Sequence, residues 1–245
     1  MNMKKTTFAI LALALLMSAC VKPDPEQEPK RFSILGDSYS TYAGFVHPET
    51  NDLYHYENIG LTGPEQMWWA QVIESTGWTL ERNNSFSGSL MCNYDYVNYY
   101  GPHSFIRRMD DLGNPEVIFI FGATNDACAN DEGEPLVALG DYVYSDWTEE
   151  QFNDFRPALA YIFDYLKAHY PNAKLYFLLD MNLGTGGVTE HRRNEFLTSI
   201  HHIAYHYGVE CIDLIGIHKQ QWHPDVKGHQ DIAEQVIDYL ASGSH

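Results

Sequence analysis

The chain has 245 residues, a formal net charge of −18 at pH 7, 44% hydrophobic residues and four cysteines. This length is enough for one domain with a buried core, and the negative charge argues against nucleic acid or an anionic bilayer as the surface that the folded domain binds, because phosphates would be repelled. Setting aside Cys20, discussed next, leaves three cysteines, which excludes a disulfide framework since at most one pair could form within the chain.

The beginning of the chain has the pattern of an export signal. Lys4 and Lys5 precede an apolar run, residues 8–17, that is too short to span a bilayer as a permanent helix. Small residues then stand directly before Cys20, and this resembles the lipobox of bacterial lipoproteins, in which the signal is removed and the cysteine carries the lipids. The alternative is an ordinary signal peptide with a chance cysteine.

We therefore expect residues 1–19 to be a lipoprotein signal peptide, and residues 20–30 to be a lipidated cysteine with an acidic, proline-rich tether. The folded domain would occupy residues 31–245. Under this interpretation the protein is exported and is held to the bacterial cell envelope by its lipid alone. The outer membrane is the expected location, and the choice between its periplasmic and surface sides stays open.

Apolar runs of strand length alternate with helical patterns along the domain. In chain order we predict a strand at 32–35, a capping box at 62–65 with a helix behind it, a weaker strand at 78–81, a strand at 117–121, a capping box at 148–151 leading a helix that Pro157 would kink, a strand at 175–179, a helix around 196–204, a strand at 209–215 and a helix at 232–240. Buried strands separated by amphipathic helices indicate a three-layer α/β/α sandwich with a mainly parallel five-stranded sheet.

In such sheets ligands bind beyond the carboxyl ends of the strands. The polar segments GDSYS, NNSFSGS, GATNDAC and HKQQWHPDVKGH follow the first, second, third and last predicted strands. Taken alone, the serine at position 38 in GDSYS would read as part of an ordinary turn. The segment also lacks the second glycine of the G-x-S-x-G nucleophile elbow of α/β hydrolases.

Taken together, the four segments resemble the SGNH hydrolases, the GDSL-type esterases and lipases. Four residues follow strands one, two, three and five in the order that this family has: Ser38, Gly88, Asn125 and His223. The resemblance also includes Asn83, Ser85 and Ser87 in the second block, Thr124 and Asp126 in the third, and Pro224 and Gly228 after the histidine. It covers residues 31 to about 241 and implies the flavodoxin-like fold of SGNH hydrolases.

The resemblance implies a role for each of the four residues. Ser38 would attack an ester carbonyl, with His223 as the general base. The backbone N–H groups of Ser38 and Gly88 and the side-chain amide of Asn125 would form the oxyanion hole. No metal and no cofactor is implied.

Two positions depart from the family pattern. Ala123 stands where the family has a glycine two residues before the asparagine, and Gln220 stands where it has an aspartate three residues before the histidine. The carbonyl oxygen of a glutamine can accept a hydrogen bond from the imidazole and so orient His223, but it carries no negative charge. The alternatives are a backbone carbonyl near Gln220 or the carboxylate of Asp213.

Two groups of residues could ligate a metal in principle: His202 with His206, and His218 and His223 with Asp225 and His229. His202 and His206 have the spacing of a zinc pair on a helix, but the glutamate of a metalloprotease is missing between them, which favours a solvated helix face. Helical periodicity from Asp225 onward would turn His229 away from His223. We therefore predict no metal site.

The segment MCNYDYVNYYGPH, rich in tyrosine, would lie at the rim of the site and suits sugar rings. We predict a serine esterase for small acyl esters, with an O-acetyl group on a carbohydrate as the expected substrate. A lysophospholipase or thioesterase on the same site, or a glycan-binding module that has lost catalysis, are the alternatives. The oligomeric state and a disulfide between Cys92 and Cys128 are left open.

Overall fold

A computed structural model describes residues 28–46, 56–94, 101–129, 136–184 and 187–243. The predicted signal peptide, Cys20 and most of the tether lie outside the described residues and stay predictions. Residues 28–30, which are described, are exposed and lead into the first strand. Within the described ranges, no helix combines the length and the apolar character needed to cross a membrane.

Five strands form one parallel sheet in the order β2-β1-β3-β4-β5. The strands are β1 (Arg31–Gly36), β2 (Thr79–Ser85), β3 (Val117–Phe121), β4 (Lys174–Asp180) and β5 (Glu210–Leu214). Every side chain of β3 is buried, which explains why its sequence, VIFIF, has no polar alternation. This order reverses at β1 and β3, the position at which flavodoxin-like sheets bind their ligands.

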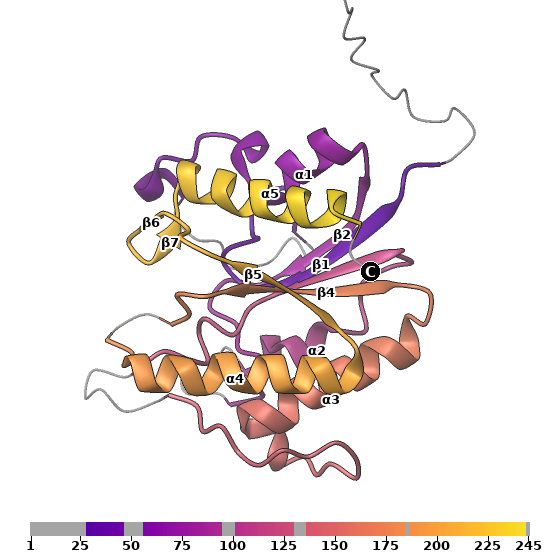
Figure 1. Cartoon of the computed structure of the whole chain (residues 1–245), viewed down its shortest axis with the longest axis vertical. Coiled ribbons are helices and arrows are strands. Elements are labelled where there is room, and N and C mark those ends of the chain that lie inside the picture. Colours follow the sequence, from indigo (N-terminus) through magenta and orange to yellow (C-terminus); the bar gives the residue numbers. More distant parts are fainter. Residues whose placement is uncertain (1–27, 47–55, 95–100, 130–135, 185–186, 244–245) are drawn as a thin grey trace, which may run out of the picture.

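Helices cover both faces of the sheet (Figure 1). One face carries α1 (Trp68–Thr76) and α5 (Val226–Ala241), and the other carries α2 (Phe105–Arg108), α3 (Phe155–His169) and α4 (Glu190–Tyr207). Each helix layer closes its own cluster of buried apolar side chains against the sheet. The predicted three-layer α/β/α fold is therefore confirmed.

The capping box predicted at 62–65 was wrong in its partner, because Gln66 and not Glu65 accepts from the N–H groups of Thr62 and Gly63. The box predicted at 148–151 has its pair of Thr148 and Gln151, and both boxes precede short 3-10 turns instead of α-helices. The short helices are η1 (Tyr56–Ile59), η2 (Pro64–Gln66), η3 (Gly101–His103) and η4 (Gln151–Asn153). The Thr62 N–H donates to Oε1 of Gln66 over 2.7 Å, and the Thr148 N–H donates to Oε1 of Gln151 over 3.0 Å. The α-helices begin a few residues later in both cases, at Trp68 and at Phe155.

The predicted kink at Pro157 was also wrong, because the α-helix starts later than the sequence pattern indicated. Because α3 begins at Phe155, Pro157 is its third residue. The N–H groups of the first turn have no partner within a helix, so a proline there removes no hydrogen bond.

A tight hairpin links β5 to α5. Its strands, β6 (Lys219–Gln220) and β7 (His223–Pro224), pair antiparallel around a turn made of Gln221 and Trp222. Both turn residues have positive φ, 49° and 72°, as a type I′ turn requires. Since neither is a glycine, each conformation costs about 1 kcal/mol or more, which the surrounding contacts must offset.

Candidate active site

Ser38 lies in the turn that directly follows β1. The Asp37 N–H donates to the carbonyl of Phe121, and Asp37 in turn accepts from the backbone N–H of Tyr39 (3.0 Å) and of Ser40 (3.1 Å). A Cβ on Gly36 would lie 2.5 Å from Oγ of Ser85, so the strand can end this close to β2 only with glycine. The turn therefore holds Ser38 in place at the carboxyl edge of the sheet.

The hairpin brings His223 to this serine, 185 positions away in the sequence. Nε2 of His223 is 2.9 Å from Oγ of Ser38, and Nδ1 is 3.1 Å from the backbone carbonyl of Gln221. A carbonyl oxygen can only accept, so Nδ1 carries the proton and Nε2 is left as the acceptor for the serine hydroxyl. This is the tautomer that a general base needs.

The structure brings the backbone carbonyl of Gln221, and not the side chain of Gln220, to Nδ1 of His223. Gln220 is exposed in β6, so its side chain does not have the suggested orienting role. The acceptor is instead the alternative that the sequence left open, a backbone carbonyl near Gln220. The tight turn explains this, because its backbone folds back toward the histidine. Asp213, the other alternative, lies 3.3 Å from His201 instead.

Tyr39 connects the serine turn to the hairpin. Its hydroxyl donates to the carbonyl of Trp222 over 2.8 Å, and its ring meets that of His223 edge-on at 5.6 Å between centroids. Burial among these groups lowers the pKa of His223 below its usual 6.5; the bond to Gln221 opposes this shift and the charge of Lys219 adds to it. The imidazole therefore stays neutral, and able to accept a proton, to a lower pH than a free histidine.

The loops after β2 and β3 carry the proposed oxyanion donors. Gly88 has a φ of 76°, a conformation that favours glycine, and Nδ2 of Asn125 donates to the carbonyl of Ser89 over 2.9 Å. Ala123, which replaces a family glycine, still adopts a positive φ of 73°. Because alanine has a side chain, this conformation carries some backbone strain.

Two buried charged groups join these loops: Asp126, which the sequence analysis named only as part of the third block, and Arg108, which it missed. Asp126 accepts from the N–H of Met91 with both carboxylate oxygens at 3.0 Å, which ties the third loop to the second. Arg108 donates to the carbonyl of Gly36 (3.1 Å) and to Oγ of Ser89 (2.9 Å), which ties the end of β1 to the second loop. Burial raises the pKa of Asp126 to about 6 and lowers that of Arg108 to about 9.

A buried ion pair lies under the hairpin. Lys219 donates to Oδ2 of Asp180, at the end of β4, and to the carbonyl of Asn182 over 3.2 Å. The Lys219 ammonium also lies 5.5 Å from the ring centroid of Tyr39. The pair therefore connects the hairpin both to β4 and to the serine turn.

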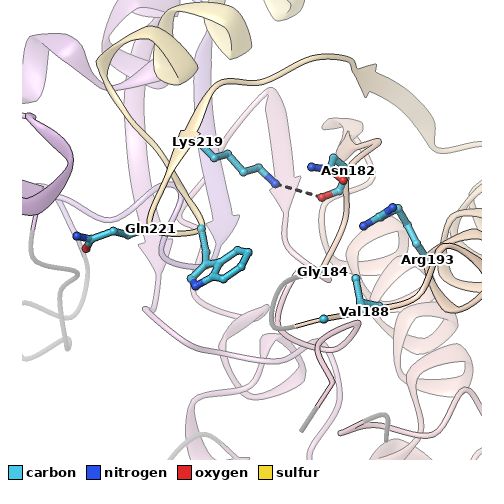
Figure 2. A pocket seen from close by; sticks show the side chains of 8 residues that line it. Asn182, Gly184, Val188, Arg193, Lys219 and Gln221 are labelled. Carbon is cyan, nitrogen blue, oxygen red and sulfur yellow. Dashed lines mark hydrogen bonds between the residues drawn. The ribbon is translucent and has the colours of Figure 1, made fainter. Parts of the chain in front are cut away.

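A cavity of about 460 Å³ opens beside the hairpin (Figure 2). It is lined by residues from the segment after β4, from α4 and from the hairpin: Asn182, Gly184, Gly187, Val188, Arg193, Lys219, Gln221 and Trp222. Because two of these residues directly precede His223, the cavity shares a wall with the candidate active site.

The four other histidines considered in the sequence analysis, His202, His206, His218 and His229, have other contacts. His229 is buried, and its Nδ1 accepts from the N–H of Trp68 over 3.3 Å, whereas His218 lies 2.7 Å from a carboxylate oxygen of Asp225. The rings of His202 and His206 lie against tyrosines of the segment before α3. None of these rings faces Ser38.

Cys92 and Cys128 are both buried, and no disulfide joins them. Burial raises the pKa of the Cys92 thiol, so it is a poor nucleophile. Of the tyrosines predicted at the rim, Tyr94 is partly exposed, and those at positions 96, 99 and 100 lie outside the described residues.

The model of the GDSL-like lipase/acylhydrolase family matches residues 30–240. A crystal structure from Bacteroides ovatus ATCC 8483, described as a GDSL-like lipase, is 41% identical with a TM-score of 0.76 and covers 88% of this chain and 100% of its own. One from Bacteroides uniformis ATCC 8492, with the same description, is 37% identical with a TM-score of 0.77 and covers 88% and 97%.

A more distant likeness extends to a family two carbohydrate esterase from Clostridium thermocellum, solved in complex with cellohexaose. It is 14% identical with a TM-score of 0.55, and the match covers 89% of this chain and 66% of that one. At this identity the likeness shows the fold alone. No curated protein matches the chain.

Proposed function

The chain belongs to the GDSL-like lipase/acylhydrolase family and is a hydrolase that acts on esters, and from this premise we propose that Ser38 is its nucleophile and His223 its general base. The contact of 2.9 Å between Oγ of Ser38 and Nε2 of His223 carries this proposal. That distance lies within the range for direct proton transfer.

In the first step Oγ of Ser38 bonds to the ester carbonyl carbon while its proton passes to Nε2 of His223. The imidazolium that forms is held at Nδ1 by the carbonyl of Gln221, which supplies a dipole in place of a carboxylate. His223 then gives the proton to the leaving alcohol, and water, activated by the same nitrogen, releases the acid from Ser38.

The negative oxygen of the tetrahedral intermediate would be held by the backbone N–H groups of Ser38 and Gly88 and by Nδ2 of Asn125. These roles are supported by a hydrogen bond that joins the loops after β2 and β3, in which Asn125 donates to the carbonyl of Ser89, the residue after Gly88. One hydrogen of the Asn125 amide is used in that bond, and the other is left for the oxyanion. Losing one such donor typically costs about a hundred- to a thousandfold in turnover.

As substrate we propose a small acyl ester, an O-acetyl group, on a carbohydrate. Trp222, 62% exposed beside His223, offers a flat aromatic surface of the kind on which a sugar ring stacks. The fold that the chain shares with a carbohydrate esterase agrees with this choice. The prediction that the protein is an exported lipoprotein would place it where extracellular glycans are met.

The test is the covalent adduct that a fluorophosphonate probe forms with an activated serine, measured by intact mass. Because Oγ of Ser38 displaces fluoride from phosphorus and HF is lost, wild type should gain the mass of one probe minus HF, and Ser38→Ala should gain none. Ser242→Ala is the matched control, because Ser242 follows α5 at the end remote from the hairpin, about 24 Å along a helix of 16 residues. No adduct on wild type would contradict the proposal and favour a module that only binds glycans.

A panel of esters with acyl chains from acetyl to decanoyl then tests the substrate. We expect the highest kcat/KM for acetyl esters. A long-chain optimum would indicate a lysophospholipase or thioesterase and would contradict the acetyl-sugar proposal.

A further inference from the structure

Within the part of the chain that the structure describes, the cavity beside the hairpin holds one cation, Arg193, that no carboxylate pairs, in a chain whose net charge is −18. We propose that this cavity binds the alcohol part of the substrate and that it selects a sugar with a carboxylate group, an acidic sugar ester, through Arg193. The inference rests on the proposed esterase function and adds the chemical class of the alcohol.

The cavity is placed to receive the alcohol part. Its hairpin wall includes Gln221, whose carbonyl meets Nδ1 of His223, and Trp222, whose carbonyl is held by Tyr39. Its volume of about 460 Å³ lies in the range of small-molecule sites, roughly 300–1,000 Å³. A sugar bound there would lie next to the base that returns a proton to the leaving alcohol.

Arg193 supplies the unpaired charge. Its Nε donates to the carbonyl of Leu183 over 2.9 Å, which fixes the side chain, and Figure 2 shows the guanidinium extending from α4 toward Asn182. Among the residues that the structure describes, no carboxylate pairs with Arg193 or lines the cavity. The two terminal nitrogens of a guanidinium match the two oxygens of a carboxylate, so a bidentate bond can form.

Lys219, the other cation of the cavity, is already neutralised. Its ammonium donates to Asp180, which is only 1% exposed, and to the carbonyl of Asn182, as the dashed line in Figure 2 marks. The net charge of the lining is therefore close to one. A single positive charge suits a carboxylate, whereas a doubly charged phosphate would leave a negative charge unpaired.

Trp222 adds the surface for the ring of the sugar. The residue adopts a φ of 72°, and this strained conformation is held by the bond from the hydroxyl of Tyr39 to its carbonyl. The ring is 62% exposed at the edge of the cavity, where a large apolar side chain gains little from folding. Backbone strain kept at such a position is typical of a residue that binds a ligand.

The experiment compares two acetyl esters that differ at one carbon, the O-acetylated methyl glycosides of galacturonic acid and of galactose. Wild type should hydrolyse the acidic ester with a kcat/KM about ten- to a hundredfold higher than the neutral one. In Arg193→Gln this ratio should fall by the same factor. Arg107→Gln is the matched control, because Arg107 is an exposed arginine of α2 that faces Glu149, and the ratio should stay at the wild-type value.

Arg193→Lys guards against a folding defect, since it keeps the charge and should keep part of the preference. Fluorophosphonate labelling of each variant reports whether Ser38 is still reactive. Normal labelling with equal rates on both esters, or with a preference that Arg193→Gln leaves unchanged, would overturn the acidic-sugar proposal and leave the esterase intact. A preference for sugar phosphates or lysophospholipids would overturn it as well.

If wild type failed to label, the esterase proposal itself would fall. The preference of the cavity for an acidic sugar can then be tested by measuring dissociation constants, with calorimetric titration of methyl galacturonoside and methyl galactoside into Ser38→Ala. Tighter binding of the acid, lost in Ser38→Ala/Arg193→Gln, would support an acidic-sugar site. Equal binding of the two glycosides would overturn it.

Discussion

Replacing Gln220 by alanine should leave ester hydrolysis almost unchanged, although Gln220 stands where the family has the aspartate that orients the histidine. The structure gives that task to the carbonyl of Gln221, 3.1 Å from Nδ1 of His223. A main-chain carbonyl is not removed by a change of side chain at the neighbouring position. Gln220→Ala therefore distinguishes a role of the Gln220 side chain from a role of the Gln221 carbonyl.

The expected size of the effect of Gln220→Ala on the rate follows from the exposure of the Gln220 side chain. Gln220 is exposed, and substitutions at such positions usually change stability by no more than about 0.5 kcal/mol. If the same amount reached the transition state, the rate would change by about a factor of two. Losing a residue that truly fixes the tautomer costs about ten thousandfold in the serine-protease example.

The assay is kcat/KM for p-nitrophenyl acetate with wild type and Gln220→Ala, with Ser38→Ala as the baseline. A fall of a hundredfold or more in Gln220→Ala would refute the role of the carbonyl of Gln221. Gln220→Asp is the companion variant. If its carboxylate reached His223, it would raise the pKa of that histidine and move the acid limb of the pH profile to higher pH.

Three further results are expected. Because burial lowers the pKa of His223 below 6.5, kcat/KM should rise with pH and level off with an apparent pKa below 6.5; an inflection above that value would argue against His223 as the base. Tyr39→Phe removes the hydroxyl bond to Trp222 and should lower the free energy of unfolding by about 1 kcal/mol in urea and lower kcat more than it raises KM; an unchanged kcat would show that the hairpin holds its position without the bond. Gly88→Ala forces a side chain onto a φ of 76° and should reduce kcat at least about tenfold by displacing the N–H of residue 88, whereas wild-type turnover would show that this N–H keeps its place with a side chain present, as the backbone at Ala123 does.

The layers of the fold could be predicted because burial leaves a clear pattern in the sequence. The apolar run of β3 can only be an inner strand, and the amphipathic stripes fix the helices that cover it. The prediction for β2 was weaker and too short, since the strand continues to Ser85 through polar residues. Asn83 and Asn84 are buried there because their amides donate to the carbonyls of Ser40 and Arg108, partners that lie far away in the sequence.

The site was predicted as a set of side chains, whereas the groups that hold these side chains in place were either missed or left open among alternatives. The acceptor for Nδ1 of His223 is a backbone carbonyl, which every residue has and no sequence pattern marks. Gln221 and Trp222 form a turn that usually contains asparagine and glycine, so they give no turn signal. The pair of Lys219 and Asp180 is likewise invisible, because its members meet only after β4 and the hairpin have come together.

The separation of 185 positions between Ser38 and His223 also determines at which stage of synthesis and folding the chain can first hydrolyse an ester. The serine turn is synthesised before the hairpin, so a chain that ends between the two has a serine without a base. Contacts over such a separation form late in folding, because the loop that they close costs entropy until the rest of the sheet is in place. A chain whose hairpin has not yet docked on the sheet would therefore leave esters untouched, and turnover would report the molecules in which folding has brought Ser38 and His223 together.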